Sequence, residues 1–548
     1  MPGPGPRRLG AAAVAVLLAA CTAQVHVPPP STDIDEVGFR DVLRNLTADE
    51  YEGRRPGTTG EDKTIAFLTA QFRRLGLRPG NGDSYVQPVP LLEITAAADA
   101  SLTITGRGRT TAFDYAKNMV IWSKRPAAEA SLRHSEIVFA GYGIVAPEYA
   151  WNDYAQTDVT GKTVVVLAGD PGTGGANPQL FRGNAGTSYG RWIYKAEEAA
   201  RHGAAGLLVI HDPRLAGYSW AAVVNSFTGP QFGAAPGGAQ APPRPAVEGW
   251  LDAASAPNLF AQAGLGTAAI ESAGRAGFKA MRTNLVADAL VHNVIRPVTS
   301  ANLIAVLPGY GHKQEAVLYT AHWDHLGRRG DTTFTGAVDD ASGVAGLVVL
   351  AQSFVRTHPA ADRSIGFIAF TAEEGDGLLG SRYYIEHPLF SLQRTVAALN
   401  LDVLHIGGPA RDVMVIGSGN SELEDYLREQ ALLQGRETHA DAAPEAGDYY
   451  RTAAFAFAAA GVPALYARAG LDDSARGPVA GRQRFDDYRS RRFRQSGDVY
   501  HADWDVRGTL DDLRLYYAVG NRLARTRRYP RFYPTSEFSS SATTGAAP

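Results

Sequence analysis

Histidine and carboxylate side chains follow a series of apolar segments in the second half of this 548-residue chain. These residues are His322, Asp324, Asp339, Glu373, Glu374, Asp402 and His501. Imidazole nitrogens and carboxylate oxygens are ligands that Zn²⁺ prefers in proteins. Taken singly, each residue has an ordinary interpretation, because aspartates cap helices and paired glutamates occur in solvated turns. Several such pieces at strand ends within one domain favour a metal site instead.

The sequence lacks the patterns of several other chemistries. No Gly-x-Ser-x-Gly elbow indicates a serine hydrolase, and the glycine-containing stretches 141–143 and 417–419 lack the full dinucleotide fingerprint. A net charge of −3 offers no field for binding nucleic acid. We expect His325 to be an ordinary surface or hydrogen-bonded core residue. The arginine-rich stretch 482–494 is expected to be a solvated loop.

The elements around the candidate site alternate between strand and helix. After Ser300 the apolar patterns predict strands at 315–320, 364–370 and 395–401, with helices at 342–355 and near Ser381. Such alternation is typical of a largely parallel sheet with both faces covered. In open α/β sheets, ligands bind at the carboxyl ends of the strands, which is where the candidate residues stand.

The chain is expected to contain a second, inserted domain. The region 136–278 has short strand patterns, one helix at 191–202 and a stretch rich in glycine and proline at 229–245. The predicted divisions are the first part of the catalytic domain at 35–134, the inserted domain at 135–280, the second part of the catalytic domain at 281–526 and a disordered tail at 527–548.

The N-terminus reads as an export signal. Arg7 and Arg8 precede an apolar run that is too short to span a bilayer as a mature helix. The run ends in Leu18-Ala19-Ala20-Cys21, which resembles a bacterial lipobox, with Cys21 as the lipidated residue. We therefore expect a signal peptide at 1–20, a tether at 21–34, and attachment to a membrane of the bacterial envelope, facing the periplasm if the cell is Gram-negative.

These motifs together resemble the M28 family of zinc peptidases, in the branch with an inserted protease-associated (PA) domain. The motifs in the catalytic part are Gly53-Arg54-Arg55-Pro56-Gly57, Ala321-His322-Trp323-Asp324-His325-Leu326-Gly327, Gly336-Ala337-Val338-Asp339-Asp340-Ala341-Ser342-Gly343, Thr371-Ala372-Glu373-Glu374, Asn400-Leu401-Asp402 and Tyr500-His501. The inserted region fits through Gly141-Tyr142-Gly143, Asp153-Tyr154 and Gly190-Arg191-Trp192. The resemblance implies a three-layer α/β sandwich around a mostly parallel mixed sheet, with a smaller β-rich PA domain of α/β type.

The resemblance also implies a role for each candidate residue. Asp339 would bridge two Zn²⁺ ions, one held further by His322 and Asp402 and the other by Glu374 and His501. Glu373 would be the general base for a water between the metals, Asp324 would orient His322, and Tyr500 would help to stabilise the tetrahedral intermediate. The implied reaction is removal of the N-terminal residue from peptide substrates.

Three alternatives remain open from the sequence. A carboxypeptidase acting on an acidic C-terminal residue would need arginines in its pocket, for which Arg451, Arg468 and Arg482 are candidates. A glutaminyl cyclase on a related fold would use one zinc ion. A lipoprotein that binds peptide or metal without turnover is the non-enzymatic alternative, against which the presence of Glu373 argues.

Overall fold

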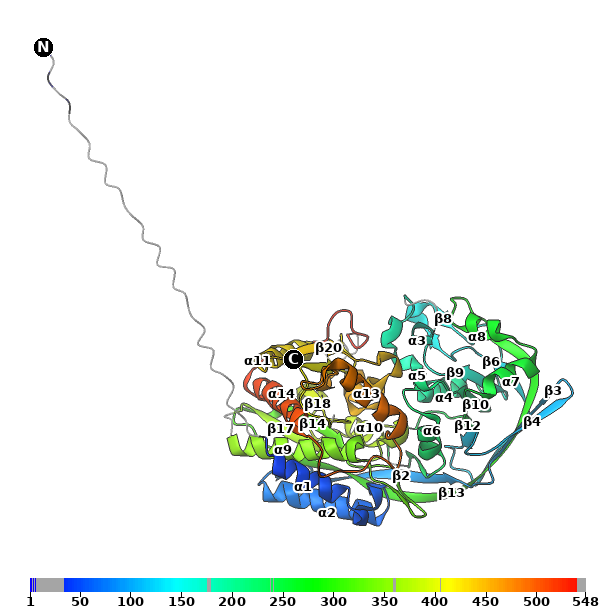
Figure 1. Ribbon diagram of the computed structural model, residues 1–548, viewed down its shortest axis with the longest axis horizontal. Coiled ribbons are helices and arrows are strands. Elements are labelled where there is room, and N and C mark those ends of the chain that lie inside the picture. Colours follow the sequence, from blue (N-terminus) through cyan, green and yellow to red (C-terminus); the bar gives the residue numbers. More distant parts are fainter. Residues whose placement is uncertain are drawn as a thin grey trace.

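A computed structural model describes residues 34–539, with gaps at 175–178, 237, 240, 358–360 and 405, together with the isolated positions 1, 3 and 5. The predicted signal peptide, Cys21 and almost all of the tether lie outside the described residues. The chain folds into two lobes, a larger one that contains both ends of the described part and a smaller one at its side (Figure 1).

The larger lobe is built on a mixed sheet whose central strands are parallel. Its order is β11, β2, β13, β17, β14, β18, β21, β19, β20. The bounds are β2 Val86–Ala96, β11 Gln231–Ala234, β13 Met281–Leu307, β14 His312–His322, β17 Arg363–Phe370, β18 Thr395–Asn400, β19 Asp412–Val415, β20 Glu437–Ala440 and β21 Ala464–Ala469. Strands β17, β14, β18 and β21 run parallel to their neighbours within this group. The carboxyl ends of these four strands therefore meet at one edge.

Helices cover both faces of this sheet and make three layers. One face packs against α1 (Glu36–Leu46), α2 (Thr59–Arg74), α9 (Ser342–Thr357), α11 (Leu423–Leu433) and α14 (Arg507–Arg525). The other face packs against α10 (Leu379–Glu386), α12 (Ala453–Ala459) and part of α13 (Gly477–Arg491). Strands β17, β18 and β21 are buried along their whole length, as expected for parallel strands covered on both sides. The predicted α/β class and mostly parallel sheet are confirmed.

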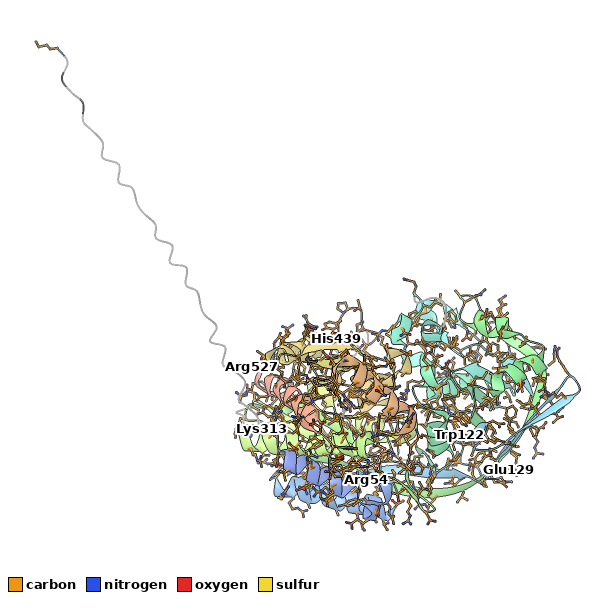
Figure 2. The ribbon with its side chains drawn as sticks, viewed as in Figure 1. Arg54, Trp122, Glu129, Lys313, His439 and Arg527 are labelled. Carbon is orange, nitrogen blue, oxygen red and sulfur yellow. The ribbon has the colours of Figure 1, made fainter. Side chains whose placement is uncertain are left out.

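The smaller lobe is a β-rich α/β unit with its own core. Its strand order is β4, β3, β13, β6, β9, β10, β12, β5. The bounds are β3 Ser101–Gly106, β4 Arg109–Phe113, β5 Met119–Trp122, β6 Glu129–Phe139, β9 Thr163–Leu167, β10 Gly206–Ile210, β12 Val247–Leu251, α3 Pro171–Gly174, α4 Trp192–Arg201, α5 Pro213–Ala216, α6 Trp220–Phe227, α7 Ser255–Ala263 and α8 Thr267–Ala273. In this core Trp122, labelled in Figure 2, stacks on Phe227 with ring centroids 4.5 Å apart. The assignment of this lobe as a PA domain stays a prediction.

A single long strand joins the two lobes. Strand β13 spans 27 residues and pairs with β3 and β6 in the smaller lobe and with β2 and β17 in the larger one. The core of the smaller lobe therefore extends from Ala96 to Val291, beyond the predicted 135–280. The boundary lies at the turn between β2 and β3 on its first crossing and within the continuous strand β13 on its second.

Two other expectations are corrected by the structure. Residues 527–539, predicted to begin a disordered tail, pack on the larger lobe through the buried Phe538, and Glu537 lies 3.0 Å from Arg182 of the smaller lobe. The stretch 482–494, predicted to be a solvated loop, lies mostly within helix α13, with Phe485 packed against the core. In both cases a few aromatic residues among many polar ones provide the packing.

Candidate metal centre

The predicted metal ligands gather at the carboxyl edge of the parallel strands. His322 is the last residue of β14, and Glu373 and Glu374 follow β17 by a few residues. Asp402 stands two residues after the end of β18, the other neighbour of β14. Asp339 lies in the one-turn segment η5 (Ala337–Ala341), directly before α9. The order of the strands therefore brings together residues that are far apart in the sequence.

One cluster of potential ligands consists of His322, Asp340 and Asp402, whose ligand atoms lie within 4.8 Å of one another. Nε2 of His322 lies 4.0 Å from Asp402 Oδ1 and also 3.4 Å from Asp339 Oδ1. On the opposite side of the ring, Nδ1 lies 3.1 Å from the carbonyl oxygen of Asp324 and 3.5 Å from its carboxylate. Contacts of this kind fix the ring orientation and leave Nε2 facing a metal. The structure thus places Asp324 where the predicted orienting role requires it.

A second cluster joins Asp339 to Glu374 and includes a residue that the sequence did not single out. Nδ1 of His325 lies 2.8 Å from Glu374 Oε1, and an Arg494 guanidinium nitrogen lies 2.9 Å from Oε2. Burial opposes ionisation of Glu374, but Arg494 and His325 hold its pKa well below its ordinary value. Ligand atoms of His325, Asp339 and Glu374 lie within 4.8 Å of one another. His325 had no distinguishing local pattern, because its proximity to Glu374 depends on the pairing of β14 with β17.

Several buried polar atoms in this second cluster lack hydrogen bonds. Within the described ranges, no hydrogen-bond partner is present for Asp339 Oδ2, for either carboxylate oxygen of Glu374, or for either ring nitrogen of His325. The nitrogen atoms of His325 and Arg494 thus lie close to the carboxylate of Glu374 without hydrogen-bond geometry. Buried polar groups normally have hydrogen-bond partners. Carboxylate oxygens and imidazole nitrogens that lack such partners and lie close together are suited to coordinating a cation. The residues present fit zinc.

His501 and Tyr500 lie at the rim of the site. His501 is exposed, lines the same cavity, and has its ring centroid 5.9 Å from that of Trp504. It belongs to neither cluster. Tyr500 packs against Trp504 at 5.6 Å and is absent from the described residues that line the cavity. The predicted roles of His501 as a ligand and of Tyr500 in stabilising an intermediate stay predictions.

Two buried aspartates position the ligand loops. Asp340 accepts hydrogen bonds from the backbone N–H groups of His322, Gly343 and Val403, so it caps α9 and ties it to two ligand segments. Asp498 accepts from the N–H groups of Val338 and Asp339. A helix-capping role was one expectation for Asp340. No local signal pointed to Asp498, whose partners lie about 160 residues away.

Glu373 is buried beside the ligands and lines the cavity. Its two carboxylate oxygens accept hydrogen bonds from the backbone N–H and the hydroxyl of Ser381, at 2.8 and 2.9 Å. Burial, with a smaller contribution from Asp324, raises the pKa of Glu373 to about 8, although the bonds from Ser381 favour the charged form. A carboxyl group with a pKa near neutrality can both accept and return a proton.

The ligand clusters open into a cavity of about 490 Å³, within the range of small-molecule and cofactor sites. The larger lobe supplies most of its lining, and Gly217 of the smaller lobe also contributes. Arg451 and Arg468 line the cavity, whereas Arg482 is half exposed and lies next to Asp486. The structure therefore brings two of the three candidate arginines to the site.

The fold and the site together define an α/β domain with potential metal-ligating histidine and carboxylate side chains at the ends of its parallel strands. Residues 302–518 match the sequence family described as Peptidase family M28. This part of the chain is therefore similar in sequence to M28 peptidases, as the motifs indicated.

Individual known proteins resemble parts of this chain. A vacuolar membrane protease of Schizophyllum commune is 33% identical over 107 residues, which cover 20% of this chain and 11% of that protein. Aminopeptidase YwaD of Bacillus subtilis is 36% identical over 108 residues, covering 19% and 22% of the two chains. The chain thus spans less than a quarter of the length of either relative.

A solved aminopeptidase structure from Aneurinibacillus sp. strain AM-1 resembles most of this chain, with a TM-score of 0.53. The two share 18% sequence identity, and the similarity covers 90% of this chain and 95% of that one. At this level of identity the likeness concerns the fold, and it includes both lobes.

Proposed function

We propose that the protein is a zinc-dependent aminopeptidase that holds two Zn²⁺ ions and removes the N-terminal residue of peptides. The observation that carries the proposal is the position of Glu373, a buried carboxyl group that lines the cavity beside two groups of potential metal ligands. Several atoms of these ligands have no hydrogen-bond partner among the described residues. His322, Asp402 and Asp339 would hold one ion, and Asp339, Glu374 and His501 the other. When bound, the ions would polarise the scissile carbonyl and stabilise negative charge.

The residues of the chain supply the remaining functions. Glu373 accepts the proton of the attacking water and passes it to the leaving amine, while Ser381 holds its carboxylate in place. Asp324 orients His322 and also accepts hydrogen bonds from the backbone N–H groups of Glu373 and Glu374. One aspartate thus fixes both the imidazole and the turn that carries the base.

A second candidate function is a carboxypeptidase acting on an acidic C-terminal residue. It is supported by Arg451 and Arg468, which line the cavity. A one-zinc glutaminyl cyclase and a non-catalytic binding protein remain further alternatives. The buried Glu373 beside two ligand clusters favours hydrolysis with two metals over both of these.

Matched peptides test whether the enzyme recognises the N-terminal or the C-terminal end of its substrate. We expect N-terminal acetylation to abolish turnover by the zinc-loaded protein, because an aminopeptidase must recognise a free α-amine. Amidation of the C-terminus should leave turnover intact. The reverse pattern would assign the protein to the carboxypeptidase alternative, and a chelator should suppress activity in either case.

The mechanism is tested by exchanging each glutamate for glutamine. Glu373→Gln removes the proton acceptor and should lower kcat by at least about 10²-fold with unchanged zinc content, since general-base catalysis contributes roughly 10²- to 10⁴-fold. Glu374→Gln should reduce the zinc bound per chain, because a neutral amide is a poorer ligand than a carboxylate. Glu437, which is exposed on β20, provides the control: Glu437→Gln should change neither quantity. Retention of most activity by Glu373→Gln would refute the mechanism.

A further inference from the structure

One wall of the cavity is rich in arginine. Six guanidinium groups line the cavity, those of Arg451, Arg468, Arg484, Arg489, Arg492 and Arg494. They come from η9 (Asp448–Arg451), from β21, from helix α13 and from the residues that follow that helix. Helix α13 packs against the core through Phe485. Its residues Arg484 and Arg489 are therefore held at the cavity instead of moving freely in solvent.

Three of these arginines share one carboxylate. Asp448 forms ion pairs with Arg451, with Arg468 at 3.0 Å and with Arg489 at 2.7 Å. Although burial opposes its ionisation, these arginines hold the pKa of Asp448 well below its ordinary value, so it is charged. A second carboxylate nearby, Asp441, has its pKa raised by burial and by Asp448. Arg451, Arg468 and Arg489 therefore outnumber Asp448 and Asp441 even when both aspartates are charged.

Arg468 has unused hydrogen-bonding capacity next to the metal ligands. Its exposure is 6%, and among the residues described by the structure its Nε has no hydrogen-bond partner. Strand β21 pairs in parallel with β18, with Tyr466 opposite Asn400. Asp402 lies two residues beyond the end of β18, and both Arg468 and Asp402 line the cavity. The arginine therefore lines the same cavity as this predicted metal ligand.

An unsatisfied buried guanidinium N–H destabilises the protein unless something binds to it. Arginine matches the planar geometry of a carboxylate and is the usual choice for recognising one. On the basis of the proposed aminopeptidase function, we propose that this arginine wall binds a substrate carboxylate and that the enzyme prefers peptides with an acidic N-terminal residue. The carboxylate is then that of the glutamate or aspartate side chain, held while the adjoining peptide bond lies at the ligand clusters.

The preference is measured with the zinc-loaded wild-type protein and three peptides. Glu-Ala-amide and Gln-Ala-amide have nearly the same shape and differ in one charge, while acetyl-Ala-Glu offers a carboxylate only at the opposite end. We expect kcat/KM for Glu-Ala-amide to exceed that for Gln-Ala-amide by about tenfold or more, as one charge-assisted hydrogen bond provides. Equal values for the two amides would overturn the inference and leave the aminopeptidase function standing. Cleavage of acetyl-Ala-Glu alone would overturn both.

Variants of Arg468 then test whether this residue causes the preference for an acidic N-terminal residue. Arg468→Gln should lower the ratio of kcat/KM between the Glu and Gln peptides toward one, whereas a structural role would reduce both values together. Arg468→Lys keeps a cation beside Asp448 and serves if the first variant does not fold; it should lower the ratio in part, because lysine lacks the planar fork. Arg482→Gln is the control, since Arg482 is half exposed on α13 and lies outside the cavity lining. An unchanged ratio in a folded Arg468 variant would overturn the assignment.

Discussion

At the scale of single residues, the hydrogen bonds around Glu373 influence its pKa and therefore how much of it is ionised at a given pH. Burial raises its pKa, and the two bonds from Ser381 oppose that rise because they favour the charged carboxylate. Removing the hydroxyl of Ser381 should therefore raise the pKa further. Only the ionised form of Glu373 can act as a base, so at a given pH less of the enzyme would be competent.

We accordingly expect Ser381→Ala to move the ascending limb of the kcat/KM profile to higher pH. The shift should reach up to about one pH unit, since one hydrogen bond contributes about 1 kcal/mol and one pKa unit corresponds to about 1.4 kcal/mol. Zinc bound at the proposed site would lower the pKa of Glu373 in both proteins alike, so the difference between their profiles is the measurement. Ser353→Ala, which removes a buried hydroxyl bonded within α9, is the control. Superimposed profiles for Ser381→Ala and wild type would contradict the role of Ser381.

At the scale of elements, one buried arginine holds the ligand loops together. Arg54 follows α1 in the larger lobe (Figure 2) and donates hydrogen bonds to the carbonyl oxygens of Leu46, Trp323, Thr335 and Gly336. It thereby connects the end of α1 with the loops that lead from His322 and into Asp339. Burial lowers the pKa of Arg54 to about 10, while the nearby aspartates favour its charged form.

Arg54→Lys should destabilise the protein by about 2–4 kcal/mol, because an ammonium group cannot reach all four carbonyls and each unsatisfied one costs roughly 1–3 kcal/mol. The free energy of unfolding of the zinc-free protein in urea measures the effect. Arg44→Lys on the exposed face of α1 should change it by less than about 0.5 kcal/mol. Equal stabilities of the two variants would show that the four bonds contribute little.

At the scale of the whole molecule, the smaller lobe completes the arginine wall. Arg489 donates to the carbonyl oxygen of Gly217 at 2.6 Å, and Arg451 donates to that of Ala216 at 3.0 Å. Asn225 on α6 donates to the carbonyl oxygen of Arg494 at 3.0 Å. Strand β13 is continuous through both lobes, and Gly217 of the smaller lobe, next to these contacts, lines the cavity.

We also propose that the mature protein is attached to a membrane through lipid on Cys21, on the basis of the lipobox-like residues 18–21. Two or more acyl chains give lasting attachment, whereas one gives only marginal binding. Cys21→Ala should therefore move the protein from the membrane fraction to the soluble fraction of cells that process lipoproteins. Thr22→Ala should remain with the membrane. An unchanged distribution of the Cys21 variant would refute the anchor.

The sequence alone determined the fold class and the residues that gather at the strand ends. Helix and strand patterns are local, and polar residues directly after buried strands must meet where parallel strands end, as His322, Glu374 and Asp402 do. The tertiary structure decided which distant side chains complete the site. His325 reaches Glu374, Asp498 holds the loop of Asp339, and two arginines of α13 line the cavity, because strand order and helix packing bring together segments that carry no local signal of one another. The second lobe boundary likewise lies within β13, because this one strand continues from one sheet into the other.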